Sequence, residues 1–229
     1  MVTWPDLGNP APKEQPQPWQ PMSWPQGDRL QLDSLASSLS CLAEVDEFLR
    51  TRRTERLFGP ITDAALGTWL DLGCRAQIFE GTAYGFDISW RPAPSAGAIH
   101  PIHLIFATPG QSSWRRYDGI SHALIDVPSE LDAKEVHRAM QEVLPTVHAT
   151  LILYAAEVGK TAAKYDHPAS LVWRDAGALL AVMGLAAHAQ SLAFCPLGVT
   201  GEPWVGRLLE QQGLFGVGAA FVGTRLTPN

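Results

Sequence analysis

Cysteine is scarce in this chain, and its spacing argues against several classes of protein. The 229 residues contain three cysteines, Cys41, Cys74 and Cys195, and no CxxC pair. An odd number of isolated cysteines speaks against a disulfide framework and against a zinc site, and it favours a reducing compartment. We therefore expect a cytoplasmic protein without a metal site.

Charged residues are also few, and the acidic ones are in excess. They make up 17% of the chain, and the formal net charge is −6. A general nucleic-acid binder would be basic, so we expect no nucleic-acid partner. The motifs GxGxxG, GxxxxGK[ST], GxSxG and HExxH are absent from the sequence, so the functions that they indicate lack support.

The sequence lacks a basic N-terminal segment followed by an apolar run, so we expect no signal peptide. One long stretch, residues 176–201, carries no formal charge, but it contains His188, Gln190, Pro196 and several glycines. Such a composition favours a buried helix followed by a loop over a membrane span.

Proline and tryptophan are concentrated at the start of the chain. Residues 1–28 hold seven prolines and three tryptophans, a density that forbids helix and favours an extended conformation. We expect either an extended arm that lies on a surface, its own or a partner's, or a disordered tail. Residues 29–229 form the expected domain, and 46% of the whole chain is hydrophobic.

The spacing of apolar residues predicts helices and strands in a mixed order. Apolar positions three and four apart predict helices from Leu32 to Leu49, over 62–73 with Gly73 as the stop, over 129–144 with Ser129 as the cap, and over 170–192. The last of these helices is apolar nearly all round, which is typical of a core helix. Short apolar runs predict strands at 103–108, 150–158 and 219–225. The fold class is therefore α+β, with a central sheet flanked by helices.

An arginine run, "RTRRTERLF", places Arg50, Arg52, Arg53 and Arg56 within seven residues of an acidic protein. Guanidinium groups bind phosphate in a bidentate manner, and Thr54 adds a hydroxyl donor. A solvated helix end, with cations that complement the helix dipole, explains the same composition.

The stretch "PSAGAIHP", residues 94–101, brackets small residues between two prolines just before a predicted strand. Small residues let backbone N–H groups approach a planar or anionic ligand closely, although an ordinary loop has the same composition. His100 and His103 do not form a metal pair, because residues three apart lie on opposite faces of a strand.

Two later segments also combine polar groups with turn residues. "AAKYDHPASLVWRDAG" contains Lys164 and Tyr165 ahead of a helix, and the pair is either a surface turn or a set of proton-transfer groups at the mouth of a cleft. His167 is a lesser candidate for the same chemistry. "FCPLGVTGEP" reads as a loop whose glycines, Gly198 and Gly201, allow close approach to a flat ligand, or simply end a helix.

Taken together, the four segments resemble the nitroreductase-like FMN flavoproteins, and within them the SagB/ThcOx-type oxidoreductase branch. The matching stretches are "RRTERLF", "PSAGAIHP" and "KYDHPASLVWRDAGALLAVMGLAAHAQSL", and the resemblance covers about residues 45–229. It implies a nitroreductase-like fold with a mainly antiparallel central sheet.

The resemblance also implies an FMN cofactor and assigns residues to it. The arginine run would hold the phosphate and the ribityl chain, and the "PSAGAIHP" backbone would lie against the isoalloxazine ring. The implied phosphate and ribityl contacts are Arg52, Arg53, Thr54, Arg56 and Arg225; the ring contacts are Pro94, Ser95, Ala96, Gly97, Leu197 and Gly198; the catalytic pair is Lys164 and Tyr165.

Members of the branch resembled are homodimers with FMN at the subunit interface. They remove two hydrogens from a thiazoline or oxazoline ring in a peptide or carrier-bound intermediate, so a cyclodehydratase or a carrier protein is the expected partner. Other nitroreductases have an asparagine after the Pro-Ser pair where this chain has Gly97–Ala98, which disfavours nitro reduction. An NAD(P)H-dependent flavin or nitroreductase, and a catalytically silent scaffold for a ring-forming enzyme, are the alternatives.

Overall fold

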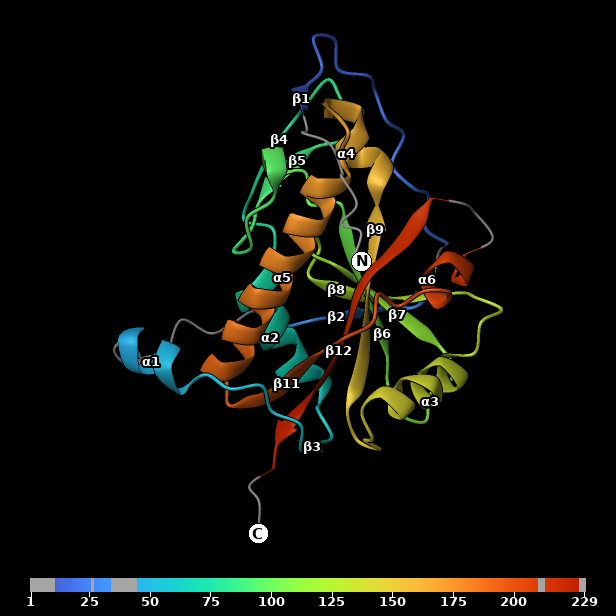
Figure 1. Ribbon diagram of the computed structural model, residues 1–229. Helices are drawn as coiled ribbons and strands as arrows, with labels where there is room; N and C mark the ends of the chain where they lie inside the picture. Colours follow the sequence, from blue (N-terminus) through green and yellow to red (C-terminus); the bar gives the residue numbers. More distant parts are fainter. Residues whose placement is uncertain (1–10, 26, 34–44, 210–212, 227–229) are drawn as a thin grey trace, which may run out of the picture.

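The computed structural model describes residues 11–25, 27–33, 45–209 and 213–226. Helices and strands alternate irregularly along the chain (Figure 1). The helices are α1 (Val45–Thr51), α2 (Asp63–Cys74), α3 (Ala133–Val143), α4 (Val158–Lys164), α5 (Ala169–Ala189) and α6 (Trp204–Arg207), with a 3₁₀ turn η1 (Ala96–Ala98). The strands are β1 (Ala11–Pro12), β2 (Arg29–Gln31), β3 (Phe58–Gly59), β4 (Ile78–Glu80), β5 (Ile88–Trp90), β6 (Ile102–Ala107), β7 (Trp114–Asp118), β8 (Ala123–Val127), β9 (Thr150–Glu157), β10 (Tyr165–Asp166), β11 (Leu192–Leu197) and β12 (Leu214–Arg225).

Eight strands form the central sheet in the order β11-β12-β9-β6-β7-β8-β2, with β3 beside the end of β12. Every pairing in it is antiparallel. The α+β class with an antiparallel central sheet is therefore confirmed.

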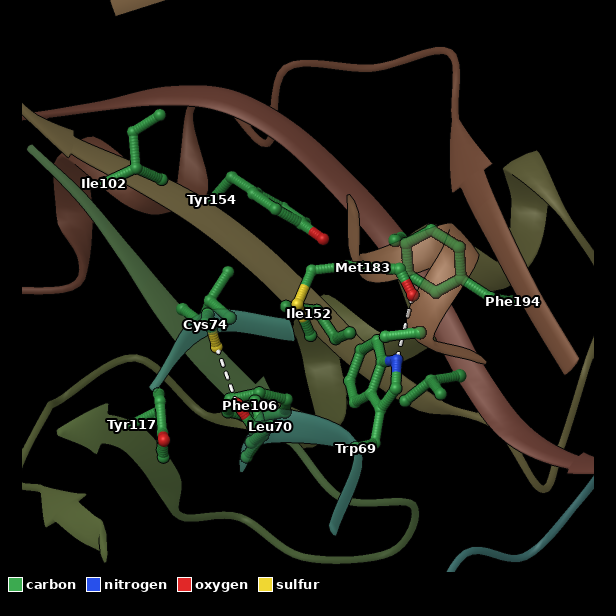
Figure 2. Close-up of a cluster of buried hydrophobic side chains, with 14 of the residues drawn as sticks. Trp69, Leu70, Cys74, Ile102, Phe106, Tyr117, Ile152, Tyr154, Met183 and Phe194 are labelled. Atoms are coloured by element: carbon green, nitrogen blue, oxygen red, sulfur yellow. Dashed lines mark hydrogen bonds between the residues drawn. The ribbon is translucent and has the colours of Figure 1, made fainter. Parts of the chain in front are cut away.

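Helices cover both faces of the sheet, because the strands alternate apolar side chains to each side. On β6, Leu104 and Phe106 pack with α2 and α5, whereas Ile105 packs with α3 and α6 on the other face. Figure 2 shows the first of these two cores, in which the Trp69 indole N–H donates to the carbonyl oxygen of Met183 at 2.9 Å. This bond ties α2 to α5.

Three predicted helix boundaries differ from the structure. Residues 29–31 form strand β2 and buried Leu32 is not helical; the rest of that predicted helix up to 44 lies outside the described residues. Helix α2 runs past Gly73, where a Cβ would overlap the Met183 sulfur, so this glycine serves close helix packing and not termination. Asp132, not Ser129, caps α3, through a bond from the Lys134 N–H.

The C-terminal third also differs from the sequence-based prediction. Residues 194–197, read as a loop, belong to strand β11, and Pro196 is tolerated there because β11 has β12 as its one strand neighbour in the described sheet. The last strand, β12, begins at Leu214 and lies between β11 and β9. It is therefore a central strand of the sheet.

Helix α5 crosses one face of the sheet and is the one described helix whose length and hydropathy would suit a membrane span. It packs against α2, β11 and β12, but one face of it is exposed in the single chain. Trp173 is 45% exposed, and Gly177 and Ala181 are exposed one and two turns further along. Helix α5 therefore belongs to the core, as expected, on one side, whereas its other side is exposed in the single chain.

The proline-rich segment runs over the surface of its own domain, as the blue trace in Figure 1 shows. Its strand β1 pairs with β10, and the Lys13 N–H donates to the Lys164 carbonyl at 3.0 Å. Further on, the indole N–H of Trp19 donates to the buried carboxylate of Glu157 at 2.9 Å. Residues 1–10, including Trp4, lie outside the described residues.

Candidate active site

The loop that begins at Pro94 is anchored to α5 by the carboxylate of Asp175. The Ser95 hydroxyl donates to Asp175 Oδ2 at 2.6 Å, and the Ala96 N–H donates to Oδ1 at 3.1 Å. The Ser95 oxygen in turn accepts from the His100 N–H at 2.9 Å. Burial raises the pKa of Asp175, although these hydrogen bonds stabilise its charged form. Ser95 thus fixes both ends of the loop.

At Gly97 this loop meets the Lys–Tyr pair. Gly97 has φ = 62°, and a Cβ placed on it would lie 2.9 Å from Lys164 Nζ and 3.0 Å from the Tyr165 hydroxyl. The absence of a side chain therefore lets both polar groups approach the backbone. Lys164 ends α4 and Tyr165 begins β10, and the ammonium lies 5.4 Å from the Tyr165 ring centroid. The chain separates these two motifs by more than sixty residues, yet the fold brings them together.

The arginine run lines a separate groove. Arg52, Arg53 and Thr54 border a groove of about 280 Å³ whose other wall is apolar. That wall comes from one face of α5 and from β11, and it includes Leu180, Ala181, Gly184, Leu185, Phe194 and Pro196. A cationic rim beside an apolar wall suits a ligand that combines a phosphate with a planar ring.

Several of the predicted phosphate contacts are engaged with other groups of the protein. Arg53 donates to the carbonyl oxygens of Arg50 and Arg52, at 2.5 and 2.8 Å, so it supports its own loop. Arg225 forms an ion pair with Glu55 at 3.0 Å. Arg56 hydrogen-bonds the Cys195 thiol. Of the two predicted arginines that line the groove, Arg52 makes no such hydrogen bond or ion pair through its side chain with a described residue.

The predicted ring contacts are divided between two places. Leu197 and Gly198 directly follow Pro196 of the groove, and Gly198 has open space around its Cα. The Pro94–Gly97 loop instead contacts α5 at Asp175, five residues before Leu180, where the groove begins on this helix. At 1.5 Å per residue, this separation is about 7.5 Å along the helix.

A cavity of about 130 Å³, which was not predicted from the sequence, lies behind the Pro94–Ser95 loop. Arg91, Arg116 and Lys160 line it together with His100 and His103. His100 belongs to the "PSAGAIHP" motif, but Arg116 and Lys160 come from distant segments, so no local motif indicated the three cations as a group. No group of three His, Cys, Asp or Glu residues in the described chain could hold a metal ion.

Burial governs the titration of the groups in this cavity. Burial lowers the pKa of His100 to about 3 and that of His103 to about 4, so both imidazoles are neutral near pH 7. It also lowers the pKa of Lys160 to about 8. Burial raises the pKa of the neighbouring Cys74 thiol to about 12, so this cysteine is not a nucleophile near neutral pH.

Comparison with known proteins identifies the family. The family model of the Nitroreductase family matches residues 49–218, and the chain belongs to this family. A candidate nitroreductase of Ralstonia eutropha JMP134 is 15% identical with a TM-score of 0.67, and the alignment covers 93% of this chain and 99% of that one. A chain of the E. coli microcin synthetase McbBCD complex with truncated pro-MccB17 bound is 16% identical with a TM-score of 0.57, over 84% and 77% of the two chains. These identities show a shared fold, and a search of curated proteins found no match.

Proposed function

We propose that the protein is an FMN-dependent oxidoreductase that converts a thiazoline or oxazoline ring, in a peptide or carrier-bound intermediate, to the azole. The observation that carries this proposal is the meeting of Lys164 and Tyr165 with the backbone at Gly97. It brings the catalytic pair of the SagB/ThcOx-type resemblance to the loop assigned to the flavin ring. Membership of the nitroreductase family supports the flavin chemistry.

The residues of the groove fit FMN. Arg52 offers a guanidinium and Thr54 a hydroxyl to a phosphate, while the apolar wall on α5 and β11 offers a surface to the flavin. The Pro94–Gly97 loop, held rigid by Asp175, presents its backbone for contact with a planar ring. Arg53 acts in this arrangement by supporting the loop, and Leu197 and Gly198 extend the groove.

The separation of these two groups supports a homodimer with FMN between subunits. The groove begins at Leu180 on α5, five residues or about 7.5 Å beyond Asp175, which holds the Pro94–Gly97 loop. No described residue lines both the groove and the cavity behind that loop. The open surface of α5, with Gly177 and Ala181, is the surface that a second copy would cover. One subunit then contributes the arginine groove and the other contributes the loop with its Lys–Tyr pair.

The chain's own residues perform the proton chemistry in this proposal. The Lys164 side chain accepts the proton lost by one ring carbon, and the Tyr165 hydroxyl orients the ring by a hydrogen bond. FMN, when bound, would supply the acceptor for the hydride lost by the second ring atom, with oxygen as the final two-electron acceptor. The ring thereby loses two hydrogens and becomes aromatic.

The expected partner is a cyclodehydratase or a carrier protein that presents the ring. One fold neighbour is part of a microcin synthetase complex that was solved with its truncated precursor bound, and this chain has the same fold at low identity. We place the reaction in the cytoplasm, without a membrane or nucleic acid. A second candidate function, NAD(P)H-dependent flavin or nitro reduction, is favoured by the family itself.

The two enzyme functions separate in one experiment with four proteins. The parent should be yellow and should remove two hydrogens from a synthetic thiazoline peptide in air, as followed by mass spectrometry. Lys164→Ala and Tyr165→Phe should stay yellow and lose about 10²–10⁴-fold in rate, because each removes a positioned proton-transfer group. Arg52→Ala should instead lose FMN affinity by about tenfold to a hundredfold, because it removes a charge-assisted contact to the phosphate.

Three results contradict the proposal in different ways. Rapid bleaching of the flavin by NAD(P)H, with no turnover of the thiazoline, assigns the protein to the reductases. Near-parental rates in both Lys164→Ala and Tyr165→Phe reduce the pair to a surface turn. If the parent binds no FMN, the remaining candidate function is that of a catalytically silent scaffold for a ring-forming enzyme.

A further inference from the structure

The cavity behind the Pro94–Ser95 loop gathers positive charge that the flavin chemistry does not use. Arg91 precedes the loop, Arg116 comes from β7 and Lys160 from α4, and all three line the same space. Trp24 of the N-terminal segment lies against its side: the Arg116 guanidinium is 4.9 Å from the Trp24 ring centroid. The cavity is thus walled by elements from across the fold.

None of these three cations forms an ion pair with a described residue. Arg91 Nε donates to the Ser89 hydroxyl at 3.0 Å, and Lys160 lies over the Phe86 ring. Arg116 Nε is buried, and it has no hydrogen-bond partner among the described residues. A buried guanidinium with an unused donor is costly unless a ligand or water accepts from it.

The carboxylates near the cavity are committed elsewhere. Asp118 accepts from the Ile120 N–H and the Ser121 hydroxyl, and Asp175 holds the Pro94–Gly97 loop. Glu157 lies behind His103, and its oxygens bind that imidazole, the Trp19 indole and the Met22 N–H. These acids balance part of the positive charge, but none of them occupies the cation donors.

We propose that this cavity binds the carboxylate of a small ligand with a single negative charge. Three cations face the two lining carboxylates, Asp118 and Asp175, which leaves one positive charge at the cavity wall. Glu157, just outside, makes the site unfavourable for a dianion such as phosphate. A volume of about 130 Å³ is slightly smaller than a cavity that holds benzene, so it suits a short-chain carboxylate such as acetate.

The site is distinct from the flavin groove but adjoins the catalytic pair. Lys160 lies one helical turn before Lys164, so the two ammonium groups share one face of α4. Ser95 borders the cavity and holds the loop. A bound carboxylate is therefore next to the reaction centre, whereas the arginine run belongs to another groove.

The test is calorimetric titration of acetate into the full chain saturated with FMN, at pH 7 and constant ionic strength in chloride. Saturable binding is expected, and Lys160→Met should weaken it by about tenfold or more, because a charge-assisted contact is lost. Arg116→Met should do the same. Lys134→Met, a matched change at an exposed lysine on α3, should leave acetate binding unchanged.

Two further arms identify the site and the charge of its ligand. Inorganic phosphate at the same concentrations should bind more weakly than acetate, and FMN affinity should stay the same in Lys160→Met. The proposal is overturned if the parent shows no saturable acetate binding, if phosphate binds better, or if Lys160→Met and Arg116→Met both bind acetate like the parent. Competition between acetate and FMN would also overturn it, by placing the anion in the flavin groove. All of these results are independent of thiazoline turnover.

Discussion

Gly97 shows how one residue without a side chain organises chemistry. Its positive φ and the close approach of Lys164 and Tyr165 both require glycine, because a Cβ would displace one of these groups. The motif that contains Gly97 was visible in the sequence, and resemblance assigned the Lys–Tyr pair. Their contact was not visible, since it depends on how α4 and β10 follow β9.

His103 makes the stability of the fold sensitive to acid. Burial lowers its pKa to about 4, so the folded state excludes a proton that the unfolded chain binds below about pH 6.5. Stability is therefore complete near pH 7 and decreases as the pH falls from 6.5 towards 4. Hydrogen bonds with His103 and the N-terminal segment outweigh burial and hold the pKa of Glu157 below its usual value, which adds to the loss at lower pH.

We expect the parent to lose about 2 kcal/mol through His103 alone between pH 6.5 and pH 5. His103→Gln should reduce this loss by a similar amount, because glutamine does not titrate and still donates to Glu157. Urea unfolding at pH 7 and pH 5, at one protein concentration, measures both slopes. If the parent and the variant lose equal stability between pH 7 and pH 5, either His103 is protonated in the folded state or another group makes the fold sensitive to acid.

At the scale of elements, the sequence predicted best where periodicity was strong. Helices α2, α3 and α5 and strands β6 and β9 are present where their apolar spacing placed them. The hairpin β7–β8 was missed because "WRRYD" and "ALIDV" lack a long apolar run. Helix α4 was missed because it follows β9 without a break, and the proline in β11 made that strand read as a loop.

The features that could not be predicted from the sequence depend on contacts between distant elements. The flavin groove depends on the packing of the arginine segment against α5 and β11, and the cationic cavity depends on Arg91, Arg116 and Lys160 meeting across three elements. Individual residues of the groove and of the cavity could be picked out in the sequence, but the balance of positive and negative charge around them could not be predicted. Only the residues that belong to contiguous motifs could be assigned beforehand.

The N-terminal segment is held against α4 by Trp19, and we expect this contact to position the Lys–Tyr pair. A Cβ on Gly159 would overlap the Trp19 ring, so Gly159→Ala should release the segment. Release should expose Lys13, the one basic residue before Arg29, to trypsin and should lower turnover without loss of FMN.

A double variant provides the control for this contact. In a Trp19→Ala background the overlap is absent, so adding Gly159→Ala should be neutral or stabilising by up to about 1 kcal/mol, since alanine favours helix over glycine. Limited proteolysis and thermal unfolding report both effects. If Gly159→Ala alone resists trypsin as the parent does, the segment is not held by this packing.

At the scale of the whole molecule, helix α5 of the single chain exposes an apolar face to solvent. The family resemblance implies a homodimer, and strand β12, which lies inside the sheet, offers no free edge for a second chain. The surface that favours a dimer is the exposed face of α5. On it, Trp173, Gly177 and Ala181 follow one another at intervals of four residues. Such spacing places them on one face of the helix, and apolar surface of this kind is usually covered.

Gly177→Glu tests this surface without disturbing the subunit. Nothing lies within 4 Å of a Cβ at Gly177 in the single chain, and glutamate is a better helix former than glycine. The variant should therefore fold at least as stably as an isolated subunit, yet a buried charge at the interface should prevent assembly. Sedimentation velocity should show a dimer for the parent and a monomer for the variant, which should also have lost FMN. Val143→Glu, at an exposed apolar position on α3, should remain dimeric and yellow. A parent that sediments as a monomer while retaining FMN would mean that one chain alone builds the flavin site.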